Sequence, residues 1–216
     1  MSTNIDVYPA SPVMPLVEET RARTQQLFQE LLDRHRVGSV VEVKAFHPSD
    51  DGSIRYAEPD LRWEPEMGLG FGYWINGTWD SSSWPSCLRR EEDDLVEQSD
   101  LASDERPYGY SPEFLGRWYV LAELQVALSA EKLAAIESAD HYWSEYRNVG
   151  GPAVASTGYG LVAAALAEAT DGVIASFDSA FDGSHNGESA AEFLAWWGDR
   201  QIDFYGVESF RSTRRA

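Results

Sequence analysis

The chain has 216 residues, of which 43% are hydrophobic and 25% charged, proportions typical of a folded domain. Acidic residues outnumber basic ones by 36 to 17, so the formal net charge is −19. A surface this negative repels nucleic acids and anionic membranes and attracts basic partners, which argues against a nucleic-acid-binding or membrane-binding protein. The only cysteine is Cys87, which excludes an internal disulfide and a multi-cysteine zinc site.

Targeting and membrane signals are absent from the sequence pattern. Residues 1–20 lack the basic region and apolar run of a secretion signal, and no apolar stretch reaches the roughly 18 residues of a membrane helix. We therefore expect a cytoplasmic protein.

The first half of the chain predicts a helix followed by strands. Residues 1–13 read as an extended N-terminal arm, and residues 14–216 as a single domain. Residues 15–36 carry apolar residues at helical spacing, which indicates a helix that packs through Leu27, Phe28, Leu31 and Leu32. Residues 39–46 alternate as a strand. Asn76-Gly77 predicts a tight hairpin between strands at residues 69–75 and 78–82.

The second half mixes helices with strands. The apolar residues of 115–128 fit both the alternation of a strand and the spacing of a helix, and we favour a strand there. Ser129 then caps a helix over residues 130–146. A helix at residues 159–170, a turn at Asp171-Gly172, a strand at residues 173–177 and a short helix at residues 189–197 follow. The predicted fold class is α+β, a mostly antiparallel sheet packed with several helices. We expect the strand at residues 40–46, the hairpin and the strand at residues 173–177 to share that sheet.

The polar stretch over residues 171–199 invites a metal or hydrolase interpretation. An EF-hand beginning at Asp178 would place Ala180 third and Ser189 twelfth, which removes two ligands. A looser metal site from Asp178, Asp182 and His185, or a triad with Ser176, remains an alternative. The Gly-x-Ser-x-Gly elbow of such hydrolases is missing. We interpret the stretch as a strand, a polar loop and a helix, and expect alanine at positions 178, 182 and 185 to leave activity intact.

The remaining candidate residues favour structural interpretations. His35, His47 and His141 lack metal-binding spacing. Cys87 lies near Arg89 and Arg90, which would lower a thiol pKa, but no partner histidine can be identified, so we interpret it as an unreactive thiol. The alternate glycines of "GLGFGYW" suit close backbone approach or aromatic packing. We therefore expect no catalytic residue, metal or cofactor.

Residues 91–105 contain eight acidic residues and no basic one. Such a run is either a solvated loop or a docking surface for a basic protein. With aromatic residues as anchors, it predicts a partner-binding set of Glu91, Glu92, Asp93, Asp94, Glu97, Trp79 and Trp84.

The C-terminal third resembles a pattern found in small bacterial proteins encoded beside toxin genes. The matching residues are Thr170, Gly172, Ser176, Asp178, Ala180, Phe181, Glu192, Phe193, Leu194 and Trp196; Ser179 stands where the pattern has glycine. The chain is thereby similar to immunity proteins of contact-dependent or type VI polymorphic toxin systems. The resemblance implies a non-enzymatic inhibitor of a cognate toxin, which the charge suggests is basic. The alternatives are a hydrolase using the loop from Asp178 to His185, or an adaptor or chaperone that binds an effector.

Overall fold

The strands form two antiparallel four-stranded sheets. The computed structural model describes residues 2–49, 53–103, 109–148 and 150–211. One sheet has the order β6-β7-β1-β8, made by Pro85–Arg89, His141–Asn148, Ser2–Tyr8 and Val173–Ala175. The other has the order β3-β2-β4-β5, made by Arg55–Tyr56, Val41–His47, Gly70–Ile75 and Thr78–Ser83. The predicted α+β class is confirmed.

A long bent hairpin connects the two sheets. Asn76 and Gly77 have φ angles of 51° and 76°, as a tight hairpin turn requires, so the predicted hairpin between β4 and β5 is confirmed. Only Trp84 separates β5 from β6, which continues in the same direction into the other sheet. The segment before β4 follows β6, since Leu69 N–H donates to the Pro85 carbonyl at 3.1 Å.

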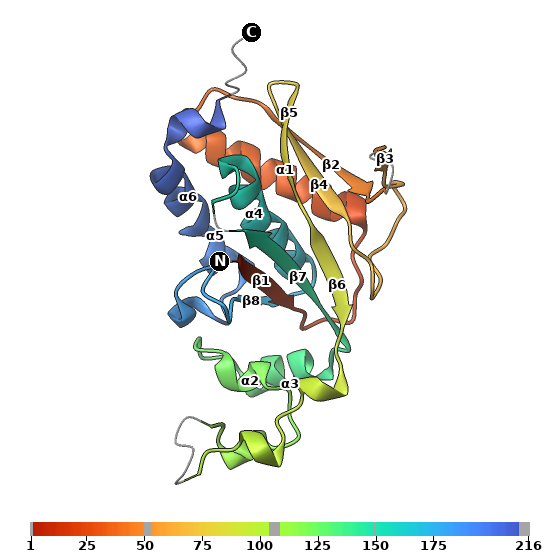
Figure 1. Ribbon diagram of the computed structural model, residues 1–216, viewed down its shortest axis with the longest axis vertical. Helices are drawn as coiled ribbons and strands as arrows, with labels where there is room; N and C mark the ends of the chain where they lie inside the picture. Colours follow the sequence, from red (N-terminus) through yellow and green to blue (C-terminus); the bar gives the residue numbers. More distant parts are fainter. Residues whose placement is uncertain (1, 50–52, 104–108, 149, 212–216) are drawn as a thin grey trace.

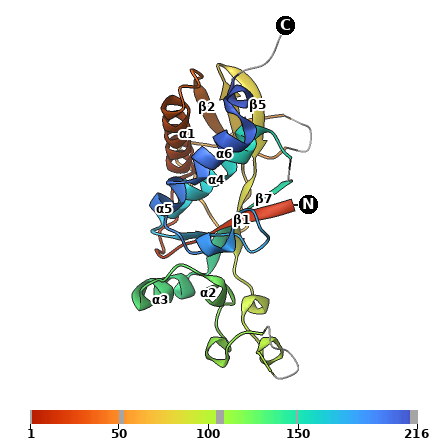
Figure 2. The same ribbon diagram turned by 90° about the vertical axis from the view of Figure 1, so that its left-hand side faces the viewer.

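Helix α4 (Ala153–Ala169) lies at the centre of the fold and is buried on nearly all sides, as expected for a helix without a polar face. Helix α1 (Val17–Arg34) packs on α4 and β2, and α5 (Ala190–Leu194) and α6 (Trp197–Tyr205) also pack on α4. Figures 1 and 2 show α1 on one side of the β2-β4-β5 sheet, with α4 and α6 beside it. The predicted inward residues of α1 are all buried: Leu27, Phe28, Leu31 and Leu32.

A smaller lobe lies below the sheets in Figure 1. Residues 90–103 and 109–139, which we call the acidic lobe, contain α2 (Val120–Glu123), α3 (Ala130–Ser138) and short 3-10 helices. Trp118, Val120 and Ile136 of the lobe pack against Tyr8 of β1 and Val173 of β8. In the part of the chain that the structure describes, the 3-10 helices are Glu92–Asp94, Gln98–Asp100, Pro112–Phe114, Gly183–His185 and Val207–Phe210.

The N-terminal segment is a strand inside the sheet, and the prediction of an extended arm is wrong. Strand β1 pairs with β7 through Ser2 to Val7 and with β8 through Asp6 to Tyr8. Its side chains are buried on both faces of the sheet, at Thr3, Ile5 and Val7 on one face and at Asp6 and Tyr8 on the other. Pro9 and Pro12 limit where the strand ends rather than whether it forms.

Three other predictions need correction. The helix predicted over residues 130–146 ends at Ser138, and the chain then forms β7, which is rich in aromatic residues and buries every second side chain. Residues 115–128 contain the short helix α2, Val120–Glu123, and no strand. Strand β8 lies in a different sheet from the hairpin, so the single predicted sheet is in fact two. Strand β6 and helix α6 were not predicted.

Among the described residues, no helix combines the length and apolar character that a membrane crossing requires.

Candidate partner-binding surface

Aromatic side chains gather on the outer face of the β2-β4-β5 sheet, opposite α1 and α4. We call the set Phe46, Tyr56, Trp74, Trp79 and Trp84 the aromatic face. Phe46 contacts Trp79 and Trp84 with ring centroids 6.2 and 5.2 Å apart, and Trp74 meets Trp79 edge-on at 4.8 Å. Trp84 and Tyr56 remain 44% and 49% exposed.

Two glycines of β4 allow these rings to lie directly on the backbone. A Cβ atom on Gly70 would come within 2.3 Å of the Phe46 ring, and one on Gly72 within 2.5 Å of the Trp79 ring. The expectation that the alternate glycines accommodate aromatic packing is confirmed for Gly70 and Gly72, whereas Gly68 faces Ser86. The Phe46, Trp74 and Trp79 rings are thus held between the backbone of β4 and one another, which restricts their motion.

One cation borders the aromatic face. Lys44 Nζ lies 4.8 Å from the centroid of the Trp74 ring and 5.6 Å from that of Tyr56, at cation–π distance. The same Nζ forms an ion pair with Glu42 at 3.0 Å. The positive charge of Lys44 is thus balanced by Glu42 beside the aromatic face.

No described helix covers the aromatic face, as Figures 1 and 2 show. Exposed tryptophan and tyrosine grouped on one face are typical of protein-binding surfaces, where such residues contribute most of the binding energy. The structure therefore places both predicted anchors, Trp79 and Trp84, on a single surface with that character.

The predicted acidic cluster lies in the acidic lobe. Glu91, Asp93 and Glu97 are exposed there. Asp94 and Asp100 accept the backbone N–H groups of residues 91 and 97, both at 2.9 Å, so their carboxylates stabilise short turns. Glu92 begins the 3-10 helix Glu92–Asp94, and its side chain is outside the described part, as are Asp104 and Glu105.

The acidic cluster and the aromatic anchors do not form one patch. Strand β6 runs between Trp84 and Glu91, and seven residues of extended chain at about 3.3 Å each span roughly 20 Å. A partner that contacts both must cover the length of β6.

A cavity opens where the two sheets diverge, and we call it the fork cavity. Strand β7 pairs with β6 as far as Pro85 opposite Glu145; beyond that point β5 pairs with β4 instead. The gap of about 420 Å³ is lined by residues 82–84 of the bent strand, residues 145–147 of β7 and the beginning of α4. Trp84 belongs to both the cavity and the aromatic face.

Glu145 is the unusual group in the fork cavity, because it is a carboxyl buried to 4% exposure. Its Oε1 accepts the backbone N–H of Trp84 at 3.0 Å, whereas Oε2 has no hydrogen-bond partner in the described structure. Burial raises its pKa to about 8, although the Ser83 hydroxyl and the Trp84 N–H act in the opposite direction. Sequence reasoning missed Glu145 because it placed residues 130–146 in a helix; alternation along residues 141–147 was the available signal.

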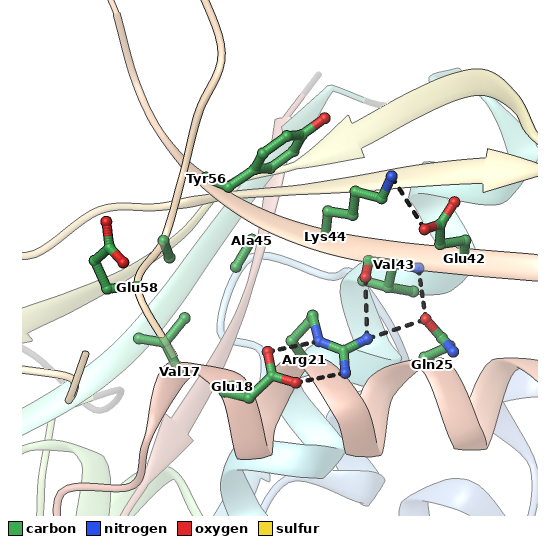
Figure 3. Close-up of a pocket in the computed structure, with 11 residues that line it drawn as sticks. Val17, Glu18, Arg21, Gln25, Glu42, Val43, Lys44, Ala45, Tyr56 and Glu58 are labelled. Carbon is green, nitrogen blue, oxygen red and sulfur yellow. Dashed lines mark hydrogen bonds and ion pairs between the residues drawn. The ribbon is translucent and has the colours of Figure 1, made fainter. Parts of the chain in front are cut away.

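A second hollow, shown in Figure 3, lies between α1, β2 and β3, and its charged groups bind one another. Arg21 forms two hydrogen bonds with Glu18, at 2.9 and 2.7 Å, and also donates to Gln25 and to the Val43 carbonyl. Because these groups already have partners, the hollow offers less to a ligand than the fork cavity does.

The polar residues of the 171–199 stretch each have separate structural partners. Both Asp178 oxygens accept the Asn4 N–H, at 2.8 and 2.7 Å, which extends the hydrogen bonding of β1 beyond the end of β8. Asp182 caps a 3-10 helix by accepting the Ser184 N–H at 2.9 Å. His185 pairs with Glu188 at 2.6 Å, so it is not joined to Ser176 and Asp178 in a triad. The alanine prediction for these positions stays a prediction.

The other sequence candidates also have local explanations. Burial raises the pKa of the Cys87 thiol to about 12 and outweighs the opposite effect of Arg89, as the interpretation of an unreactive thiol requires. His141 is buried and pairs with Asp140 at 2.9 Å. Within the described ranges, no group of three or more His, Cys, Asp or Glu side chains could hold a metal ion.

Comparisons of the chain with protein-family models, curated proteins and solved structures find no match.

Proposed function

We propose that this chain is a binding protein that captures a basic protein, a toxin domain encoded beside it, and blocks the toxin's active site or the approach of its substrate. The observation that carries the proposal is the uncovered aromatic face built on the glycines of β4. A face of this kind loses little conformational entropy on binding, because the rings are already held by one another.

The basic character of the partner follows from charge. The net charge of −19 gives the chain a negative field that accelerates encounter with a cationic protein. Glu91, Asp93 and Glu97 project from the acidic lobe, where they can steer a partner that docks on the aromatic face. Steering acts over about 10 Å in ordinary salt, so these residues need not lie in the contact itself.

The resemblance of the C-terminal third to immunity proteins supports a toxin as the partner. In the structure, the resembling residues belong to the scaffold: Phe193 is buried, Trp196 donates to Glu188 at 2.7 Å, and Asp178 binds Asn4. The hydrolase alternative is less well supported, because His185 pairs with Glu188 rather than with Ser176. The adaptor or chaperone alternative predicts binding without inhibition, and the test below separates it.

The test is protection of cells that express the neighbouring toxin. We expect the unaltered chain to restore growth, and the double variant Trp79→Ala/Trp84→Ala to lose protection. Phe204→Ala is the matched control, because Phe204 is 78% exposed on α6 and away from the aromatic face. A chain that binds the neighbouring protein but leaves cells unprotected would support the adaptor; no binding and no protection would exclude the proposal.

A further inference from the structure

One long sheet edge of this fold is open, and we propose that an extended segment of the basic partner adds to it as a strand. The open edge belongs to β5 and lies at the mouth of the fork cavity. The inference rests on the proposed function, because the occupant is a segment of that same partner.

The edges of the β6-β7-β1-β8 sheet are both covered by other parts of the chain. On the β6 edge, the Cys87 N–H donates to the Met67 carbonyl at 2.8 Å, and the segment before β4 continues this pairing. On the β8 edge, the Ile174 N–H donates to the Glu188 carbonyl at 2.9 Å. The Gly187 N–H donates to the Ile174 carbonyl at the same distance. A covered edge cannot pair with another chain.

The other sheet has one covered edge and one open edge. Strand β2 is covered by β3 and by two glutamines of α1, which accept its N–H groups at 2.9 and 3.0 Å. At the opposite edge, β5 pairs with β4 from Thr78 to Ser83. On the side away from β4, no hydrogen bond joins the backbone of β5 to another described residue. An unpaired row of N–H and C=O groups is a template for an added strand.

Strand geometry shows which backbone groups of this edge are open. Successive residues of a strand direct their N–H and C=O groups to opposite sides. The Pro85 carbonyl accepts the Leu69 N–H on the side of β4, so the groups of residues 84 and 82 point the other way. The Trp84 N–H is already held by Glu145 Oε1 at 3.0 Å. The Ser82 N–H and C=O face the fork cavity, which Ser82 lines, and are the groups with which an added strand would pair.

A β-bulge limits how much of the β5 edge is open. The register between β4 and β5 shifts at Tyr73 and Trp74, which leaves the exposed Asp80 without an opposing residue. Bulges on edge strands interrupt regular pairing and so protect against indiscriminate association. The open stretch is therefore the short one from Ser81 to the fork, which suits a brief extended segment.

The walls of the fork cavity select the side chains of the added segment. Trp84 and Tyr146, 44% and 58% exposed, offer aromatic surface to an outward side chain, which can be apolar or basic. On the inner side, Arg147 lies over the Tyr159 ring at 5.3 Å and forms no ion pair with a described residue. Its charge repels a basic side chain there and favours a small polar or acidic one.

Charge favours the basic partner over a second copy of the chain as the occupant. Two copies that pair through β5 would each bring a net charge of −19, and each an exposed Asp80, to the contact. Such a charge repels a second copy and attracts a cationic protein. Trp79 and Trp84 lie on and next to β5, so one partner can contact the aromatic face and the open edge together.

The experiment measures binding of the full chain to the purified product of the neighbouring gene, with Ser82→Pro as the test variant. Proline removes the N–H that faces the fork, and an edge strand tolerates it because that N–H is not used within the sheet. We expect Ser82→Pro to weaken binding by at least about tenfold. Ser82→Ala is the matched control, because it keeps the N–H and removes only the hydroxyl, and it should bind like the original chain.

Amide hydrogen exchange of the unaltered chain gives a second readout that does not depend on the folding of a variant. The Ser82 amide should exchange rapidly in the free chain and at least about tenfold more slowly in the complex. The Cys87 amide, which donates to Met67 within the fold, should exchange slowly in both states. If Ser82→Pro does not fold, the Ser82 amide alone decides.

Three results would overturn the inference. In the first, the neighbouring protein binds the original chain and Ser82→Pro equally well and leaves the Ser82 amide unprotected; the proposed function would then stand without strand addition. In the second, the neighbouring protein does not bind at all, which excludes the proposed function and the inference with it. In the third, light scattering shows that the unaltered chain is a dimer and Ser82→Pro a monomer, so that a second copy occupies the edge.

Discussion

Two carboxyl groups on adjacent strands, Glu145 of β7 and Asp6 of β1, are buried, and neither forms an ion pair with a described residue. Burial raises their pKa values to about 8 and about 6, from 4.5 and 3.8. Nearby hydroxyls favour ionisation, Ser83 for Glu145 and Ser144 for Asp6, but do not offset the loss of hydration. Each group therefore destabilises the folded state once the pH exceeds the unfolded pKa.

Glu145→Gln should stabilise the protein in a pH-dependent manner. The folded pKa is raised, so the free energy of unfolding of the original chain falls as the pH rises from 4.5 to about 8, and the glutamine variant does not share that fall. At about 1.4 kcal/mol per pKa unit the full difference amounts to several kcal/mol. Urea unfolding at about pH 5 and about pH 8 measures it. Asp6→Asn is the comparison: its gain in the free energy of unfolding should be complete by about pH 6. A gain in stability of Glu145→Gln that does not depend on pH would contradict the account.

Gly72→Ala should damage the aromatic face. The added Cβ would lie 2.5 Å from the Trp79 ring and 2.9 Å from the Trp74 ring, so both rings must move. We expect altered tryptophan emission, reduced partner affinity and a stability loss of about 1–3 kcal/mol. Gly183→Ala is the control, because its nearest atom, on Asn186, is 3.9 Å away. Unchanged partner affinity in a folded Gly72→Ala variant would show that the rings do not form the binding surface.

Among the elements, α1 has a role beyond burying its apolar residues, because it closes an edge of the sheet. Strand β2 pairs with β3 only at Phe46 and His47. Along the rest of this edge, Gln29 Oε1 accepts the Val41 N–H at 3.0 Å and Gln25 Oε1 the Val43 N–H at 2.9 Å. Side chains four apart on a helix thus meet alternate residues of a strand, and the edge is protected from pairing with another chain.

Gln29→Leu should destabilise the protein by about 1–3 kcal/mol, because the Val41 N–H loses its acceptor while remaining shielded by α1. It should also promote aggregation, because an edge of β2 without its acceptor can pair with another chain whenever α1 moves away from it. Gln26→Leu is the matched control, since Gln26 is exposed and bonds only to Glu30 on the same helix. Urea unfolding and light scattering compare the Gln29→Leu and Gln26→Leu variants. Equal stability and equal aggregation would mean that the hydrogen bonds from α1 to the edge of β2 contribute nothing to stability.

The elements that sequence predicted correctly are those defined by neighbouring residues. Helix α1 has a clear apolar stripe along its sequence. Asn76 and Gly77 alone determine the hairpin turn between β4 and β5. The prediction for β7 was wrong because "HYWSEYRN" follows helix α3 with no glycine or proline between them. The segment is a strand because it pairs with β1 and β6, which are far away in sequence. Local periodicity cannot distinguish those contacts from a continued helix.

The candidate site was only partly predictable for the same reason. Trp79 and Trp84 follow from composition and the hairpin, and the glycines of β4 from their alternation. The fork cavity depends on the pairing of β6 with β7 ending at Glu145 and on β5 pairing with β4 instead, a property of sheet topology that adjacent residues do not encode. An isolated glutamate between aromatic residues carries no sign that its carboxyl will be buried.

At the scale of the whole molecule, the negative field and the aromatic face should act on different rates. Neutralising Glu91, Asp93 and Glu97 with glutamine or asparagine should slow association with the partner and flatten its dependence on salt, with little change in dissociation. Neutralising Glu30, Asp203 and Glu208, exposed on the α1 and α6 side, makes the same change in net charge and is the control. Equal effects of both sets would show that overall charge, not the acidic lobe, steers the partner.

The most direct test of the central claim is a kinetic binding measurement between the purified chain and the purified product of the neighbouring gene, which we propose to be its toxin partner. We expect a complex whose dissociation accelerates about tenfold or more in Trp84→Ala. Its association should slow as salt is raised. Phe204→Ala should leave both rates unchanged. A neighbouring domain that does not bind, or a complex whose dissociation is indifferent to Trp79→Ala and Trp84→Ala while the variants remain folded, would contradict the account.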